Sequence, residues 1–320
     1  MASDTVIKAL ALEGFDRSPA VIDVPAPQPA SGELLVRVHA ASVNAYDAFV
    51  AMGMAKDFMA YEFPAVLGQD VAGVVEAAGG EVEGFHEGDR VFGTIGAKGK
   101  VHDGTFAELS TPLATALALT PASVDDQQAA SLGVAGTTAM SAVSAIDLSE
   151  GATALIIGAT GGVGTFAIQL AAARGAHVIA SVMPGDEDVV TALGAAETVD
   201  YSNDVIGAVR ERYPDGIDAV IDLVHRDPRE FGVLVGLVRS GGMAASALGG
   251  AGDATEIGEV QVHNAGGDPT RLGALASMIE EGTLKAAIRR TYPLADAAQA
   301  LADFTNDHTV GKLVITMPGA

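Results

Sequence analysis

A group of glycines near the middle of the chain has the spacing of a phosphate-binding turn. Gly158, Gly161 and Gly164 follow the apolar run Ala154–Ile157 and precede the apolar segment Phe166–Leu170. Such glycines let the backbone approach a pyrophosphate, and the amides that begin the next helix point at it. The pattern predicts a dinucleotide site; the alternative is a tight turn that binds nothing. The residues expected to contact the cofactor here are Gly158, Thr160, Gly161, Gly162, Val163 and Gly164.

The end of the next apolar run, His177–Ser181, is where the adenosine ribose is expected. A carboxylate at that point reads a 2′-hydroxyl, whereas basic residues accept a 2′-phosphate. Ser181 is small and neutral, and the following segment 183–188 holds acidic residues but no Lys or Arg. An acidic first helical turn is the simpler explanation of those acids. These residues therefore leave the choice between NADH and NADPH open.

The segments around the glycines alternate between strand-like and helix-like patterns. Alternation of this kind predicts βαβ units, a parallel sheet and an α/β fold. Before residue 119, short β-like runs separated by Gly and Pro predict a mostly β module. Gly194 stands where a helix C-terminal glycine is expected. The later elements expected are helices over 228–239, 269–281 and 296–304 and strands over 243–248, 256–262 and 312–316.

Composition limits the possible partners and chemistry. A chain of 320 residues predicts two domains. Its 41 acidic and 18 basic side chains give a net charge of −23, which disfavours nucleic acid and anionic membranes as partners. The sequence has no cysteine, so disulfides and thiolate chemistry are excluded.

Two segments bear on location. Charges at Lys8, Glu13 and Asp16 interrupt any apolar leader segment, so a cytoplasmic location is the expectation. The uncharged window 154–173 is long enough to cross a bilayer, but its glycines favour a strand, a turn and a buried helix instead.

Taken together, the motifs resemble those of the medium-chain dehydrogenase/reductase superfamily, and within it the zinc-free quinone oxidoreductase branch. The resemblance covers nearly the whole chain, and its segments occur in family order. Besides the glycine turn, they are Pro64–Val75, Gly88–Gly93, Gly104–Glu108, Val134–Thr138 and Gly311–Ile315.

The resemblance implies a domain plan and an assembly. It implies a GroES-like, mostly β catalytic domain over 1–122, completed by 292–320, and a Rossmann doubly wound domain over 123–291. The nicotinamide and the substrate are then expected in a cleft between the two domains. The family also implies a homodimer through the edges of the Rossmann sheets, with 256–262 as the expected edge strand.

The resemblance also implies zinc-independent chemistry. Zinc members of the superfamily place a Cys and a His where this chain has Asn44 and Gln69. Its seven histidines show no i, i+3 or i+4 pairing. Without zinc, the reaction that fits is hydride transfer from NAD(P)H to a small quinone or α,β-unsaturated carbonyl. Asn44, Tyr46 and Asp47 are the catalytic candidates, and Phe49 stands where the family often carries a tyrosine.

Further cofactor contacts are implied by position in the family. NADPH is the implied cofactor, although the acidic segment leaves NADH open. Two alternatives stand beside this interpretation: an enoyl-thioester reductase of the same fold, and a catalytically weak cofactor-binding protein. For Tyr46, packing on a cleft wall is the alternative to donating a proton. The additional contacts are Asn44, Thr138, Ser181, Tyr201, Val224, Leu248 and Lys312.

Overall fold

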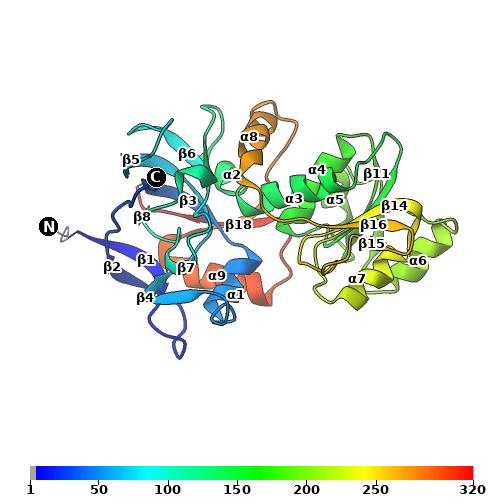
Figure 1. The fold of residues 1–320 in the computed structure, drawn as a ribbon, viewed down its shortest axis with the longest axis horizontal. Coiled ribbons are helices and arrows are strands. Elements are labelled where there is room, and N and C mark those ends of the chain that lie inside the picture. Colours follow the sequence, from blue (N-terminus) through cyan, green and yellow to red (C-terminus); the bar gives the residue numbers. More distant parts are fainter. Residues whose placement is uncertain (1–4, 320) are drawn as a thin grey trace. The chain divides into compact units, whose positions relative to one another are not determined.

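The computed structural model describes residues 5–319, in two compact units (Figure 1). Unit 1 comprises residues 1–134, 269–282 and 288–320, and unit 2 comprises 135–268 and 283–287. The first four residues and Ala320, which the expected catalytic domain includes, lie outside the described residues. The segments 123–134, 269–282 and 288–291 belong to unit 1 in this division.

Unit 2 is built on one twisted sheet. Its strand order is β12-β11-β10-β13-β14-β16-β15, and β10 to β14 pair in parallel with their neighbours. The order reverses at β10, as in a doubly wound α/β fold, which confirms the expected fold class. The strands are β10 Thr153–Ile157, β11 His177–Val182, β12 Glu197–Asp200, β13 Ile217–Asp222, β14 Val238–Ser246, β15 Glu256–Ile257 and β16 Val260–Asn264.

Helices connect these strands and cover both faces of the sheet. Figure 1 shows α4 on one side and α6 and α7 on the other. Asp204 and Asp227 cap α6 and α7 by accepting backbone N–H groups at 2.9 and 2.8 Å. Gly194 has φ +110° just past α5, as expected for a helix C-terminal glycine. The helices are α3 Val134–Ala145, α4 Gly162–Ala172, α5 Glu187–Ala192, α6 Val205–Arg212 and α7 Pro228–Val235.

Two expected elements of unit 2 are wrong in extent. The helix expected over 228–239 ends at Val235, because Gly236 follows and Val238 already pairs with Ile217 in the sheet. The strand expected over 256–262 is a hairpin in which β15 runs antiparallel to β16. Gly258, with φ +63°, begins its two-residue turn, a position that favours glycine in tight hairpins. One edge strand of this sheet is therefore the two-residue strand β15, and the other is β12.

Unit 1 contains two mostly antiparallel sheets, in agreement with the expected β module. One sheet has the order β2-β1-β4-β7, and the other β17-β18-β3-β5-β6-β9, with β8 paired to β3. The strands are β1 Val6–Leu12, β2 Ala20–Pro25, β3 Leu34–Ser42, β4 Ala60–Val66, β5 Asp70–Ala78, β6 Arg90–Thr94, β7 Lys100–Asp103, β8 Leu109–Ser110, β9 Leu117–Leu119, β17 Ile288–Pro293 and β18 Lys312–Thr316.

The C-terminal strand completes the second sheet of unit 1. β18 lies between β17 and β3, so the chain end packs directly on an N-terminal strand. Apolar residues of these strands, among them Val36, Val314 and Ile315, are fully buried. The helices of unit 1 are α1 Ala45–Ala51, α2 Asp126–Ala130, α8 Leu272–Glu280 and α9 Ala297–Asn306. This packing brings Lys312, the first residue of β18, beside the end of β3.

No helix among the described residues 5–319 is long and apolar enough to cross a membrane.

Candidate functional site

The glycine turn joins β10 to α4 in unit 2. Gly158 has φ +78°, a conformation that favours glycine, and Gly161 is the N-cap of α4. A Cβ at Gly164 would lie 2.2 Å from the Gly158 carbonyl oxygen, so helix and turn approach more closely than any side chain allows. The first amides of this 11-residue helix point into the turn. The turn therefore has the close backbone approach that its spacing predicts, and its contact with a pyrophosphate stays a prediction.

Ser181, at the end of β11, acts on the turn itself. Its hydroxyl oxygen accepts the Gly158 N–H at 3.0 Å, and the residue is 1% exposed. The hydroxyl thus holds the first glycine of the turn in place. The sequence-based expectation that Ser181 contacts the cofactor directly stays a prediction.

Other expected cofactor residues lie at the carboxyl ends of the strands of unit 2. Tyr201, Val224 and Leu248 follow β12, β13 and β14 and are 41%, 51% and 36% exposed. Thr160, within the turn, and Thr138, in α3, are largely buried. Ligands of open α/β sheets bind just outside the carboxyl ends of the strands. The fold thus places the turn and three exposed residues together at the carboxyl ends of the strands.

Asp222, the last residue of β13, is a buried polar group, also at the carboxyl ends of the strands. Its Oδ1 accepts the backbone N–H of Val224 at 3.0 Å and of His225 at 3.2 Å, and lies 3.1 Å from His225 Nδ1. Its Oδ2 is buried and has no hydrogen-bond partner. A single acid at the end of an apolar run carries no recognisable spacing, so sequence patterns do not reveal this residue.

Unit 1 holds a second group of buried polar residues, here called the buried polar cluster: Ser42, Asn44, Asp47, Asp70 and Lys312. Asp70 is its centre. Its Oδ2 accepts the Ser42 hydroxyl at 2.5 Å and the Asn44 amide Nδ2 at 2.8 Å, and its Oδ1 accepts the backbone N–H of Val134 at 2.7 Å. The end of β3 supplies Ser42, and the start of β5 supplies Asp70.

Lys312 closes the cluster from the C-terminal strand. Its ammonium donates to Asn44 Oδ1 at 2.6 Å and to the Val43 carbonyl at 3.0 Å, and lies 3.4 Å from Asp70 Oδ2. Burial lowers the pKa of Lys312, and the nearby carboxylates act in the opposite direction. These contacts fix which end of the Asn44 amide is the donor and orient it within unit 1. Whether Lys312 also contacts a cofactor stays a prediction.

Asp47 and Tyr46 lie on α1, next to Asn44. Asp47 Oδ2 accepts the Asn44 backbone N–H at 2.8 Å, while its Oδ1 is buried without a hydrogen-bond partner. Burial, followed by the charge of Asp70, raises the Asp47 pKa to about 8. The Tyr46 hydroxyl donates to the Met59 sulfur at 2.6 Å, and burial raises its pKa. The structure therefore joins Asn44 and Asp47 but turns the Tyr46 hydroxyl toward Met59.

Asn44 and Gln69, where the resemblance implies the ligands of zinc members, carry amide side chains. Asn44 is committed to the buried polar cluster through both ends of its amide. Within residues 5–319, no group of three or more His, Cys, Asp or Glu side chains is arranged to hold a metal ion.

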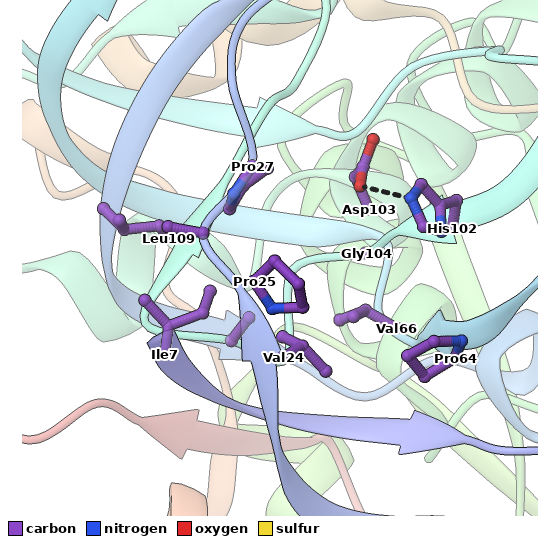
Figure 2. Close-up of a pocket in the computed structure, with 12 residues that line it drawn as sticks. Ile7, Val24, Pro25, Pro27, Pro64, Val66, His102, Asp103, Gly104 and Leu109 are labelled. Carbon is purple, nitrogen blue, oxygen red and sulfur yellow. Dashed lines mark ion pairs between the residues drawn. The ribbon is translucent and has the colours of Figure 1, made fainter. Parts of the chain in front are cut away.

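A separate apolar pocket of about 230 Å³ opens beside β1, β2 and β7 of unit 1 (Figure 2). Its lining includes Ile7, Val24 and Leu109, with His102 and Asp103 at one side, 3.5 Å apart. None of the lining residues belongs to the buried polar cluster. The pocket is therefore distinct from the residues expected to act in catalysis.

Comparison with known proteins identifies relatives over most of the chain. Residues 30–121 match the Alcohol dehydrogenase GroES-like domain, and residues 193–315 match the family described as Zinc-binding dehydrogenase. A quinone oxidoreductase of Pseudomonas aeruginosa is 31% identical, with 90% of this chain and 92% of that protein covered. A chloroplastic NADPH-dependent alkenal/one oxidoreductase of Arabidopsis thaliana is also 31% identical, with 90% and 73% covered.

The fold is also similar to that of a solved quinone oxidoreductase structure. The quinone oxidoreductase of Coxiella burnetii superposes with a TM-score of 0.86 at 28% identity, covering 98% of this chain and 99% of that one. The two family matches cover residues 30–121 of unit 1 and residues 193–315, which run from unit 2 into the C-terminal strand β18. The chain belongs to the medium-chain dehydrogenase/reductase superfamily.

Proposed function

We propose that the protein is a zinc-independent oxidoreductase that transfers hydride from NAD(P)H to a quinone or an α,β-unsaturated carbonyl compound. The observation that carries the proposal is the glycine turn, whose close approach at Gly164 leaves room for backbone only and presents the amides of α4 to a pyrophosphate. The quinone and alkenal/one reductases among the relatives supply the acceptor class.

The cofactor supplies a hydride when it is bound, and the reduced acceptor also takes up one proton. The residues of unit 2 would hold the cofactor: the turn its pyrophosphate, and the ends of β13 and β14 its nicotinamide half. The family resemblance and the name of the Arabidopsis relative favour NADPH.

The buried polar cluster would contribute through Asn44 and Asp47. Lys312 and Asp70 fix the Asn44 amide from opposite ends, so its orientation is set before any ligand binds. Asp47, with its pKa raised to about 8, holds a proton at neutral pH and keeps an unpartnered buried oxygen. Asp47 thus joins Tyr46 as a candidate proton source.

Zinc independence is supported by the donor set of the chain. The sequence contains no cysteine, and the family resemblance implies that Asn44 and Gln69 stand where zinc members carry ligands. Neutral amides are poor zinc ligands compared with thiolate and imidazole.

The test is oxidation of NADH and NADPH by a panel of quinones and enones, after dialysis against a chelator. We expect turnover that the chelator does not reduce. Absence of turnover with every acceptor while cofactor still binds would favour the catalytically weak cofactor-binding protein. Alcohol oxidation that requires added zinc would overturn the proposal. In a Tyr46→Phe variant, full turnover would assign the proton to a group other than Tyr46.

A further inference from the structure

The carboxyl ends of β11 and β12 lie side by side next to the glycine turn. Val182 pairs with Asp200 in the parallel register, and the Tyr201 N–H donates to the Val182 carbonyl at 3.0 Å. Ser181 ties the same end of β11 to Gly158. The segments that leave these strands, 183–188 and 201–204, therefore begin at one corner of the sheet.

This corner is where a doubly wound domain meets the adenosine ribose of a dinucleotide whose pyrophosphate lies on the glycine turn. NADH presents a neutral 2′-hydroxyl there, which can donate a hydrogen bond. NADPH presents a phosphate monoester, which carries a charge of about −1.5 to −2 at neutral pH. The charges at this corner therefore decide which cofactor fits.

The charged side chains that begin at this corner are acidic. They come from the loop after β11, the first turn of α5 and the end of β12: Asp186, Glu187, Asp188, Asp200 and Asp204. Three of them accept local hydrogen bonds: Glu187 from the Gly185 N–H at 2.8 Å, Asp200 from the Ser202 hydroxyl at 2.6 Å, and Asp204 from the Gly207 N–H at 2.9 Å. Asp186 is half-buried at the N-cap position of α5, and its charge acts on the Tyr201 hydroxyl. Its carboxylate is the nearest in sequence to the end of β11.

The pKa of Tyr201 shows the electrostatic effect of the acidic residues at this corner. Burial raises the pKa of its hydroxyl, and the charges of Asp186 and Asp200 raise that pKa further. Both carboxylates thus act on one exposed side chain that follows β12. A second anion placed beside Tyr201 would meet the same repulsion.

Two arginines of unit 2 form ion pairs near the amino ends of the strands, whereas the corner lies at the carboxyl ends. Arg212 pairs with Glu197 at the start of β12 at 3.2 Å, and Arg239 pairs with Asp218 near the start of β13 at 2.6 Å. Arg226 and Arg229 follow β13, which is two strands from β11 in the sheet order, or about 10 Å at the usual strand spacing. None of these four arginines belongs to segments 183–188 or 201–204, which begin at the corner.

We propose that this protein selects NADH over NADPH, with the Asp186 carboxylate as the group that excludes the 2′-phosphate. The inference rests on the proposed function, because it concerns the same cofactor site. It departs from the NADPH expected by resemblance. A repulsion of about 1.4 kcal/mol between the two charges would be enough to weaken NADPH binding about tenfold.

The first experiment is isothermal titration of the full chain with NADH and with NADPH. We expect NADH to bind at least about tenfold more tightly. Equal affinities, or tighter binding of NADPH, would overturn the inference and leave the proposed function intact. Binding of neither cofactor would overturn the proposed function itself.

Two charge-reversal variants identify the residue responsible. Asp186→Lys should raise the affinity for NADPH by about tenfold or more and lower that for NADH. Asp215→Lys is the matched control, because this substitution changes the net charge equally. Asp215 is an exposed acid just before the amino end of β13, whereas the corner lies at the carboxyl ends of the strands. Equal responses of the two variants would show that net charge, and not Asp186, sets the preference.

Discussion

Replacing Lys312 with methionine should destabilise unit 1 strongly. Lys312 and Asp70 are 3% and 0% exposed, and their charged atoms lie 3.4 Å apart. At that distance the attraction is about 5 kcal/mol for an effective dielectric constant of about 20. Removing the cation leaves a buried carboxylate without its ion pair, so we expect the free energy of unfolding to fall by about 3–5 kcal/mol.

The same change also releases Asn44. Without the Lys312 ammonium, Asn44 Oδ1 loses its 2.6 Å hydrogen bond, and the amide is no longer held in one orientation. If Asn44 acts in hydride transfer, kcat should fall, while the glycine turn, which lies in unit 2, keeps its own structure. A purely structural role would lower stability and leave kcat per folded molecule unchanged.

Urea unfolding followed by far-UV circular dichroism measures the loss, since the chain has no tryptophan to report by fluorescence. The control is Lys100→Met, which removes an exposed lysine that pairs with Glu62 at 2.7 Å and should leave the midpoint nearly unchanged. In the double variant Lys312→Met/Asp70→Asn, the losses should be less than additive by about 1 kcal/mol or more. Additive losses, or a Lys312→Met effect no larger than that of the control, would refute the reasoning.

Three further changes probe the glycine turn and the protonation of α1. Gly164→Ala should lower stability by about 1–3 kcal/mol and weaken cofactor binding. The control Gly161→Ala should be tolerated in folding, because its Cβ would lie 3.4 Å from the nearest atom. Equal thermal unfolding midpoints for the two variants would contradict this prediction. Ser181→Ala removes the acceptor of the Gly158 N–H and should cost about 1 kcal/mol, and calorimetry should show NADH and NADPH weakened alike. Burial raises the Asp47 pKa to about 8, so the folded state keeps a proton that the unfolded state releases near pH 4. The stability of the wild-type protein relative to Asp47→Asn should therefore fall as the pH rises from about 4 to 8, and a pH-independent difference would be evidence against the shift.

The sequence by itself predicted the features that depend on neighbouring residues. The glycine spacing predicted the turn, because Gly158 needs a positive φ and Gly164 a close approach, and both are local demands. The alternation of strand-like and helix-like segments predicted the parallel sheet. A strand that is buried on both faces is recognisable in the sequence as a short apolar run. The hairpin at Gly258 was missed, because its two halves together have the apolar pattern of one strand.

Only the tertiary structure decided which polar side chains meet. Lys312 and Asp70 are 242 residues apart in the sequence, and their contact arises because β18 and β5 both pack against β3. Ser181 likewise proves to hold Gly158, and Asp222 to lie buried at the end of β13. Burial and hydrogen-bond partners depend on the packing of strands distant in sequence, so residue type and spacing could name the glycine turn but not the cluster that orients Asn44.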